Sequence, residues 1–311
     1  MNLRVASRTQ RSARVISLEL RDEKVSELPA FDPGAHVEVV IPHLGGPLVR
    51  HDSLVSDPAE RRSYTIAVLR ADDSRGGSDF LHDHVRVGDS LTVSEPRNEF
   101  PLRPGAEHVV LLAGGIGITA LLGMARHLVS TGRSFELHYA ARTPEELVFR
   151  RELEAMRLPQ CHYHAPGRAS LDLVDLLGHA PPVTHVYVCG PRGLIEATRD
   201  AARRLKWDEG RVHRESFGPS ANRGDGKLRV RLAQSGIDLD VAPGTTLLDA
   251  LVLAGAFLAY DCRRGECGSC AVRVLEGRPV HRDVCLSDEA RRTLLCTCVS
   301  WAEGAELTLD V

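Results

Sequence analysis

The cysteines of this chain are concentrated near its C-terminal end. Six of the eight lie in the last fifty residues, and Cys262, Cys267 and Cys270 have the spacing C-x4-C-x2-C. The first three thiolate ligands of plant-type 2Fe-2S sites have this spacing. Gly265 and Gly268 lie between them, and because glycine has no Cβ the backbone can approach inorganic sulfides and donate N–H groups. The spacing therefore predicts an iron-sulfur cluster on this loop.

A plant-type cluster also needs a fourth thiolate from farther along the chain. Cys285, Cys296 and Cys298 are the candidates, and spacing alone does not choose among them. Zinc is the weaker alternative, because structural zinc sites usually present two C-x2-C pairs. A set of spare buried thiols is the remaining alternative. Cys161 and Cys189 stand apart from this group.

Length and composition indicate a globular protein of several domains. A chain of 311 residues fits two or three domains, and 43% hydrophobic residues allow a proper core. A net charge of -3 and a pI near 6.5 do not suggest nucleic acid as a partner. The charged N-terminus does not read as a secretory signal, and no apolar stretch could span a membrane. We therefore expect a cytoplasmic protein, whose cysteines bind metal or take part in catalysis rather than form disulfides.

The first hundred residues alternate between apolar and polar side chains in short runs. Turn-forming clusters separate these runs, and no helical pattern lies between them. Many short strands of this kind favour an antiparallel β-barrel or sandwich. The runs are residues 16–20, 37–41, 64–68 and 91–93.

From about residue 105 the pattern changes to apolar strand, glycine turn, helix and strand. Such alternation predicts a parallel sheet with helices on its faces, an α/β domain. Strands are expected at 108–113, 135–140, 161–164 and 185–189, and helices from 117 to about 132 and at 144–156, 171–177 and 193–205.

The C-terminal module follows a polar, glycine-rich stretch that reads as a linker. Two alternating runs within 228–241 precede a helix at 245–254, which a threonine hydroxyl caps. We expect an N-terminal β-barrel domain at 1–103, an α/β domain at 104–218, a linker at 219–227 and an α+β module at 228–311.

A flavin signal occurs in the first domain. Arg62, Ser63, Tyr64 and Thr65 lie on a predicted strand, with Arg62 and Tyr64 on one face and Thr65 on the other. They bring together a cation for a phosphate, a flat ring for the flavin and a hydroxyl for its reactive nitrogen. The loop Arg75, Gly76, Gly77 and Ser78 could close over the phosphate through backbone N–H groups. The alternative is an ordinary strand arginine beside a core tyrosine.

Two nucleotide signals follow in the second domain. Gly114, Gly115, Gly117 and Thr119 connect an apolar strand to a helix, where a pyrophosphate can accept hydrogen bonds from free N–H groups. Ala120 replaces the third glycine, so this is not a Rossmann fingerprint. Cys189, Gly190 and Pro191 end another strand and should lie at the same edge of the sheet, with room for a nicotinamide ring. The alternatives are a tight turn and a buried free cysteine.

Taken together in this order, residues 62–65, 114–119 and 189–191 and the cysteine array resemble the phthalate dioxygenase reductase family. The resemblance covers essentially the whole chain. It implies a flavin barrel, a nicotinamide domain and a C-terminal ferredoxin of the β-grasp type. It implies FMN held by the residues proposed above, with Thr65 at the reactive nitrogen, and NADH on the glycine turn and at Cys189. It also implies Cys298 as the fourth cluster ligand, because a Val-Ser pair follows it.

The expected activity is electron transfer from NADH through FMN to the cluster. A nicotinamide gives up two electrons as a hydride whereas the cluster accepts one, so a flavin is the adapter. By resemblance, the acceptor is the terminal oxygenase of a Rieske non-haem iron system. Arg263 and Arg264 lie on the loop that carries the cluster cysteines and could meet acidic groups of that oxygenase. The alternatives are a haem-thiolate monooxygenase as partner and a redox sensor without turnover. Arg142 could instead meet the 2'-phosphate of NADPH.

Overall fold

The computed structural model describes the chain except for residues 43–45, 73–75, 159, 166–170 and 218–224. The chain forms two compact units, Met1–Glu215 and Ser216–Val311. The first unit contains an antiparallel sheet and a parallel sheet, and the second contains a five-stranded mixed sheet. In the part of the chain that the structure describes, no helix has the length and apolar character needed to cross a bilayer.

The first sheet has six antiparallel strands in the order β4-β3-β6-β1-β2-β5. A bridge between Leu54 and Ile66 and a hydrogen bond from Val55 N–H to Thr65 O join the two edge strands, which closes the barrel. The strands are β1 Asn2–Ser12, β2 Val15–Arg21, β3 His36–Ile41, β4 Leu48–Ser53, β5 Tyr64–Leu69 and β6 Ser90–Val93, and helix α1 is Gly77–Asp83.

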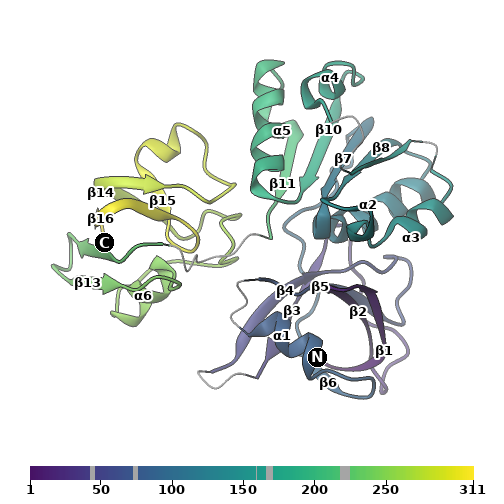
Figure 1. Ribbon diagram of the computed structural model, residues 1–311, viewed down its shortest axis with the longest axis horizontal. Helices are drawn as coiled ribbons and strands as arrows, with labels where there is room; N and C mark the ends of the chain where they lie inside the picture. Colours follow the sequence, from purple (N-terminus) through teal and green to yellow (C-terminus); the bar gives the residue numbers. More distant parts are fainter. Residues whose placement is uncertain (43–45, 73–75, 159, 166–170, 218–224) are drawn as a thin grey trace. The chain divides into compact units, whose positions relative to one another are not determined.

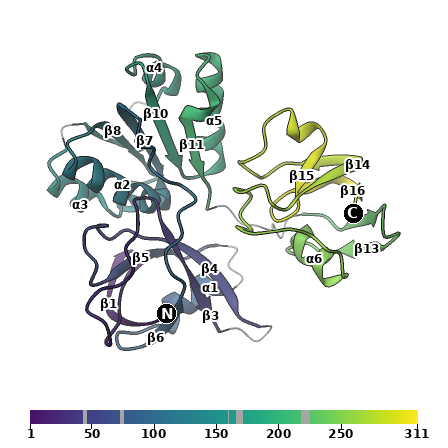
Figure 2. The same cartoon turned by 180° about the vertical axis from the view of Figure 1, so that it is seen from behind.

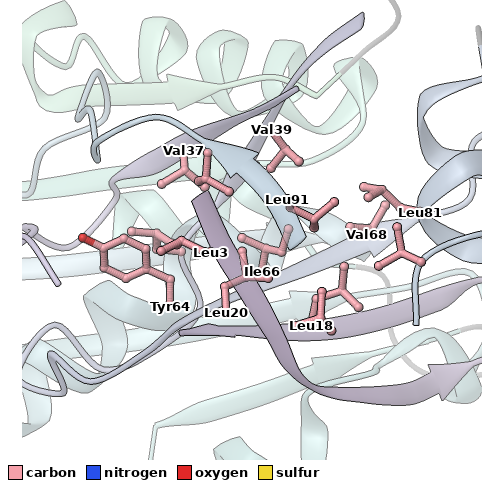
Figure 3. Close-up of a cluster of buried hydrophobic side chains, with 14 of the residues drawn as sticks. Leu3, Leu18, Leu20, Val37, Val39, Tyr64, Ile66, Val68, Leu81 and Leu91 are labelled. Atoms are coloured by element: carbon pink, nitrogen blue, oxygen red, sulfur yellow. The ribbon is translucent and has the colours of Figure 1, made fainter. Parts of the chain in front are cut away.

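The barrel encloses a core of mostly aliphatic side chains (Figure 3). Its buried strand residues come from β1, β2, β3, β5 and β6, and Leu48 of β4 packs against them. These side chains occur at alternate positions, because alternation along a strand sends every second residue to the same face. Ile66 and Val68 of β5 lie in this core together with Tyr64. The predicted antiparallel barrel is confirmed.

The second sheet has five parallel strands in the order β11-β10-β7-β8-β9. Figures 1 and 2 show α2 and α3 on one face of the sheet and α4 and α5 on the other. The strands are β7 His108–Gly114, β8 Ser134–Ala140, β9 Cys161–His164, β10 Thr184–Cys189 and β11 Val212–Glu215. The helices are α2 Ile118–Ser130, α3 Arg150–Ala155, α4 Leu173–Gly178 and α5 Arg192–Arg204, with 3-10 turns η1 Gly115–Gly117, η2 Pro144–Glu146 and η3 Glu209–Arg211.

The second unit has a mixed sheet in the order β13-β12-β16-β14-β15 with one helix, α6, near it in Figure 1. Helix α6 begins after Thr246, whose hydroxyl accepts a hydrogen bond from Asp249 N–H at 2.9 Å, so the expected threonine cap is present. The elements are β12 Leu228–Leu232, β13 Asp238–Val241, α6 Leu247–Leu253, β14 Ala271–Val280, η4 Ala290–Arg292, β15 Leu294–Cys296 and β16 Trp301–Leu309.

Several elements were not expected from the sequence. Strand β4 contains Arg50, His51 and Asp52 and shows no alternation of apolar residues, and β11 has only four residues. The helical pattern at 144–156 becomes a 3-10 turn followed by a short helix. Most of the expected linker, residues 219–224, lies outside the described residues.

Candidate functional site

The cluster loop, residues 262–270, wraps its backbone around the sulfur atoms of its own cysteines. Arg264, Glu266 and Cys267 each donate a backbone N–H to Cys262 Sγ at 3.4 Å. Ser269 N–H donates to Cys267 Sγ at the same distance, 3.4 Å. Hydrogen bonds of this kind stabilise thiolates, which are the form that binds iron. The loop therefore has the donor pattern that an iron-sulfur cluster requires.

Gly265 is required by both conformation and space. Its φ is +75°, and a Cβ there would lie 2.6 Å from Val299 Cγ2 and 2.9 Å from Asp283 Cα. Both contacts are too short for a real side chain. The glycine thus lets the cluster loop lie directly against the segment that carries Cys298.

Cys296 and Cys298 both approach the loop, but they face different partners. Their thiols donate hydrogen bonds to Cys270, which lowers the pKa of Cys270 to about 3. Cys298 accepts a hydrogen bond from the Gly265 backbone and interacts electrostatically with Cys262. Cys296 instead lies with its sulfur 3.6 Å from that of Cys285. Cys298 therefore meets more of the loop than Cys296 does.

The two arginines of the loop are not equivalent. Arg263 is 47% exposed, forms an ion pair with Asp249 and lies over the ring of Tyr260 at 5.1 Å. Arg264 is only 11% exposed and pairs with Glu266 at 3.0 Å. An ion pair enclosed in this way cannot meet a partner's surface. The expectation that both arginines form a docking surface is therefore corrected for Arg264.

The glycine turn and the Cys189 turn meet at the carboxyl edge of the parallel sheet, as expected. Strands β7 and β10 are neighbours, and Ala113 pairs with Cys189. A Cβ on Gly117 would lie 2.2 Å from Cys189 O, and one on Gly190 would lie 2.8 Å from Gly114 Cα. Only glycine permits this approach of the two backbones.

The glycine turn leads directly into α2. No side chain within the described residues caps this helix, and the N–H of Ile118, its first residue, donates to Gly115 O and Ile116 O of the turn, so an anion there would meet the backbone at the positive end of the helix. Thr119 is buried, and its hydroxyl donates to Ile116 O at 2.9 Å. Thr119 thus holds the turn in shape. Cys189 is fully buried, and Gly190 and Pro191 continue from it to α5.

The structure corrects the position expected for Tyr64. Its ring is fully buried in the barrel core, edge-on to Phe31 at 5.6 Å, and its hydroxyl donates to Pro29 O at 2.5 Å (Figure 3). Burial raises the pKa of Tyr64 to about 12. The ring therefore packs among barrel side chains, and its contact with the flavin stays a prediction.

The neighbours of Tyr64 are dispersed rather than gathered. Arg62 precedes the strand, is 81% exposed and lies 3.9 Å from Glu60. Ser63 is buried, and Thr65 pairs in register with Glu19 on the outer face of the barrel. Arg62 and Tyr64 therefore do not share one face of a strand, contrary to the expectation from period 2.

A different arginine lies at the Gly76 turn. Gly76 has φ +104° and starts α1, and a Cβ on Gly77 would lie 3.0 Å from Cδ of Arg50. Arg50 belongs to β4 and pairs with Asp52 at 2.8 Å. Ser78 is buried and accepts a hydrogen bond from Ala71 N–H at 3.2 Å. Arg75 lies outside the described residues.

The end of β4 carries buried polar atoms that lack protein partners. Among the described residues, Arg50 Nε, Asp52 Oδ2 and Ser53 Oγ are buried without a hydrogen bond. Buried polar groups are nearly always satisfied, so orphaned atoms in one segment indicate a ligand or water. Together with the glycines at the start of α1, they offer a cation, a hydroxyl and close backbone N–H groups. This donor set fits a flavin phosphate and the polar edge of its ring.

The chain after Ser53 runs beneath the nucleotide domain. Arg126 of α2 donates to Val55 O, and a Cβ on Gly123 of α2 would lie 3.6 Å from Leu54 O. The β4 end therefore lies where the barrel meets the domain that carries the glycine turn. In the sequence, Arg50 and Ser53 show neither alternation nor an aromatic neighbour. The one feature that could have pointed to these two residues is the charged and polar run from Arg50 to Ser53, which follows the apolar pair Leu48 and Val49.

Two family models match this chain. The model of the 2Fe-2S iron-sulfur cluster binding domain matches residues 230–302. The model of the oxidoreductase NAD-binding domain matches residues 111–200. The first range contains the cluster loop and Cys298, and the second contains the glycine turn and Cys189.

The relatives of known function resemble the chain over nearly its full length. It is 39% identical over 305 residues to vanillate O-demethylase oxidoreductase of Pseudomonas sp. strain HR199, with 96% of this chain and 95% of the relative covered. It is 37% identical over 318 residues to phthalate dioxygenase reductase of Burkholderia cepacia, with 100% and 97% covered. It is 42% identical over 286 residues to the heme-dependent oxidative N-demethylase beta subunit of Ectopseudomonas mendocina, with 92% and 91% covered.

Solved structures show the same arrangement of elements. Phthalate dioxygenase reductase, described as a modular structure for electron transfer from pyridine nucleotides to [2Fe-2S], matches with a TM-score of 0.79 at 37% identity, covering 100% of this chain and 98% of that one. An intact type IV self-sufficient cytochrome P450 monooxygenase matches with a TM-score of 0.71 at 33% identity, covering 100% of this chain and 41% of that one.

Proposed function

The chain belongs to the phthalate dioxygenase reductase family, and we propose that it is the reductase component of a Rieske non-haem iron oxygenase. It is an oxidoreductase that transfers electrons from a pyridine nucleotide to a 2Fe-2S cluster, with NADH, FMN and the cluster as its cofactors. The observation that carries the proposal is the cluster loop, whose sulfurs accept backbone N–H groups, on the same chain as a nucleotide-binding sheet. Bound FMN supplies the step between a two-electron donor and a one-electron acceptor.

We propose that Cys262, Cys267, Cys270 and Cys298 hold the cluster. The first three provide the loop, and Cys298 faces Cys270 and Gly265. Cys285 and Cys296 stay outside the ligand set. Thiolates from a short loop and one distant segment are the usual plant-type arrangement.

We propose that NADH binds at the edge formed by Gly114, Gly115, Gly117 and the Cys189 turn. The pyrophosphate lies against the backbone at the start of α2, because a helix N-terminus favours negative charge. The close backbones of Gly117 and Gly190 leave the Cys189 turn without bulky side chains. The nicotinamide then lies beside Cys189.

For FMN we propose Arg50, Ser53, Gly76 and Gly77 as the binding residues, with Ser78 supporting the turn. Arg50 opposes the phosphate charge, and the Ser53 hydroxyl bonds to the ring. Arg62, Ser63 and Thr65 stay candidates. Thr65 O accepts a hydrogen bond from Val55 N–H, which places Thr65 beside the chain just after Ser53, whereas the described contacts of Arg62 and Ser63 are with Glu60 and Glu19. A cation and backbone N–H donors around one anion bind it more tightly than either the cation or the donors alone.

The acceptor docks on the second unit. The segment from α6 to the cluster loop exposes apolar side chains, with Leu253 90% and Phe257 98% accessible and Tyr260 beside Arg263. Exposed aromatic residues with an arginine are typical of protein interfaces. This segment leads directly into the cluster loop, so a partner bound there comes close to the electron donor.

A haem-thiolate monooxygenase is the second candidate partner. It is favoured by the likeness to a cytochrome P450 monooxygenase, in which this chain covers 41% of the matched structure. The same reductase chemistry serves both acceptors. The two are separated by which purified oxygenase accepts electrons from the cluster.

An anaerobic NADH titration of the protein as isolated tests the reductase function. We expect flavin absorption to bleach and a rhombic 2Fe-2S signal to appear in low-temperature EPR. Bleaching without that signal would leave a simple flavin reductase and remove the ligand proposal. Catalytic reduction of a small artificial acceptor by NADH excludes a sensor without turnover.

A further inference from the structure

The parallel sheet carries a group of histidines on strands β7, β8 and β9. His108 of β7, Glu136 and His138 of β8 and His162 and His164 of β9 lie on one face, at alternate positions of neighbouring strands. His138 and His162 pair in register, and their rings stack with centroids 4.7 Å apart. Electron transfer through flavin and cluster gives this group no task.

Three of these side chains bring possible metal ligands together. One donor atom each from Glu136, His138 and His162 lies within 4.8 Å of the other two. His138 is only 8% exposed, and its Nε2 has no hydrogen bond among the described residues. Oε2 of Glu136 is 3.5 Å from this nitrogen. The imidazole nitrogen thus faces a carboxylate and a second imidazole, which is an arrangement of donor atoms that can hold a metal ion.

The remaining two histidines orient these ligands. His138 Nδ1 lies 3.1 Å from His164 Nε2, and when His138 Nδ1 donates its proton to His164, His138 Nε2 keeps a lone pair for a metal ion. His108 Nε2 lies 3.8 Å from Glu136 Oε1, and its Nδ1 lies 2.7 Å from Ser134 Oγ. Metal-binding histidines and carboxylates usually have such partners, which fix tautomer and orientation.

We propose that Glu136, His138 and His162 bind one divalent transition-metal ion of borderline softness, for which Zn²⁺ is the probe. Zinc binds imidazole nitrogen at about 2.0–2.1 Å in tetrahedral geometry, which sets the donors about 3.3 Å apart. His162 is exposed, so its ring can turn inward to close the remaining distance. Water takes the fourth position.

A second group of possible metal ligands in the described structure is less suited to bind an ion. Asp283, Cys285 and Cys296 also lie within 4.8 Å of one another. However, Asp283 already accepts hydrogen bonds from Leu286 N–H at 3.0 Å and from Arg291 at 3.2 Å. An ion there would have to displace an arginine. The histidine group holds no such cation.

The ion would join β8 to β9, which is the edge strand of the sheet. Because the folded sheet assembles the three ligands and the unfolded chain does not, the ion stabilises the folded unit. Zinc should therefore raise the unfolding temperature of this unit in proportion to occupancy. No effect on the cluster unit is expected.

The test uses untagged, full-length protein loaded with flavin and cluster. Equilibrium dialysis against Zn²⁺ with elemental analysis of zinc and iron should show one zinc per chain and unchanged iron. Zinc K-edge X-ray absorption should show nitrogen and oxygen neighbours at about 2.0–2.1 Å with imidazole scattering. A sulfur shell at about 2.3 Å, or loss of iron, would place zinc on the cysteines and overturn the proposal.

Matched variants assign the ligands. His162→Ala and Glu136→Gln should each weaken zinc binding at least about tenfold, and His164→Ala about ten- to hundredfold. His179→Ala, at the exposed residue that follows α4, should bind zinc like the natural chain. Because His162 is exposed, its variant should fold normally. Undiminished zinc binding in His162→Ala and Glu136→Gln would overturn the site.

Discussion

Two arginines near the flavin region differ in their surroundings and therefore in their expected effect. Arg50 is 24% exposed and packs against Gly77, whereas Arg62 is 81% exposed in solvent. A charge-assisted hydrogen bond contributes about 1.5–3 kcal/mol, so Arg50→Gln should weaken FMN binding roughly ten- to hundredfold. Arg62→Gln should leave it nearly unchanged. Flavin fluorescence on titration of the flavin-free protein measures both, and the reverse order would restore Arg62 as the phosphate ligand.

The cysteines of the C-terminal segment offer a matched pair. Cys298 faces Cys270 and Gly265, and Cys296 faces Cys270 and Cys285. Cys298→Ser should lose most of the iron or shift the EPR signal strongly, because a hydroxyl is a poor iron ligand. Cys296→Ser should keep both iron content and signal. Iron analysis with EPR of the dithionite-reduced proteins decides, and loss of the cluster only in Cys296→Ser would exchange the two assignments.

His213 should make the stability of the first unit depend on pH. Burial, followed by the nearby positive charges of His185, Arg103 and Arg214, lowers the pKa of His213 to about 4 from an ordinary value of 6.5. Between these values the unfolded chain binds more protons than the folded one. The contribution of His213 to the free energy of unfolding should therefore be greatest above about pH 6.5 and should decrease as the pH falls toward 4.

Denaturant unfolding at several pH values, followed by flavin fluorescence, measures this loss. In His213→Gln the decrease between pH 7 and pH 5 should be smaller than in the natural chain. His179→Gln, an exposed control, should keep the original slope. An unchanged slope in His213→Gln would show that other groups cause the pH dependence.

At the scale of elements, the two strand-to-helix turns depend on each other. A Cβ on Gly117 would meet Cys189 O, a backbone atom that cannot move away easily. Gly117→Ala should destabilise the unit by roughly 1–3 kcal/mol and weaken NADH binding. Gly193→Ala, where nothing lies within 4 Å, should not lower stability. Thermal unfolding and the KM for NADH test both, and a neutral Gly117→Ala would contradict the close approach.

The types of the helices and strands were largely predictable from the sequence. The two-residue period of apolar side chains in strands and the strand-turn-helix order are both local properties of the chain. The strands at 108–114 and 184–189 appear nearly where their apolar runs predict them. Strand β4 was missed because its second half is polar, and its pairing with β3 decides its structure. The burial of Tyr64 was not predictable for a related reason, since a tyrosine on a strand can face a core or a ligand.

At the scale of the whole molecule, the proposed electron path ends at the surface of the second unit. Phe257→Ala and Leu253→Ala should reduce electron delivery to the partner oxygenase several-fold, because exposed aromatic anchors carry much of an interface's energy. NADH-dependent reduction of ferricyanide should not change. Val129→Ala, an exposed apolar residue of the first unit, is the control. Equal rates with the oxygenase in all variants would place docking elsewhere.

The sequence by itself determined the order of the modules, the cluster loop and the glycine turn, because these depend on spacings within a few residues. Cysteine spacing, glycine positions and strand periodicity are read directly from the chain. The tertiary structure decided which residues from distant segments meet: Arg50 with Gly77, Cys298 with Cys270, and the histidines of β8 and β9 with Glu136. Such contacts depend on strand pairing and on the face that each strand buries, which are global properties of the packed chain.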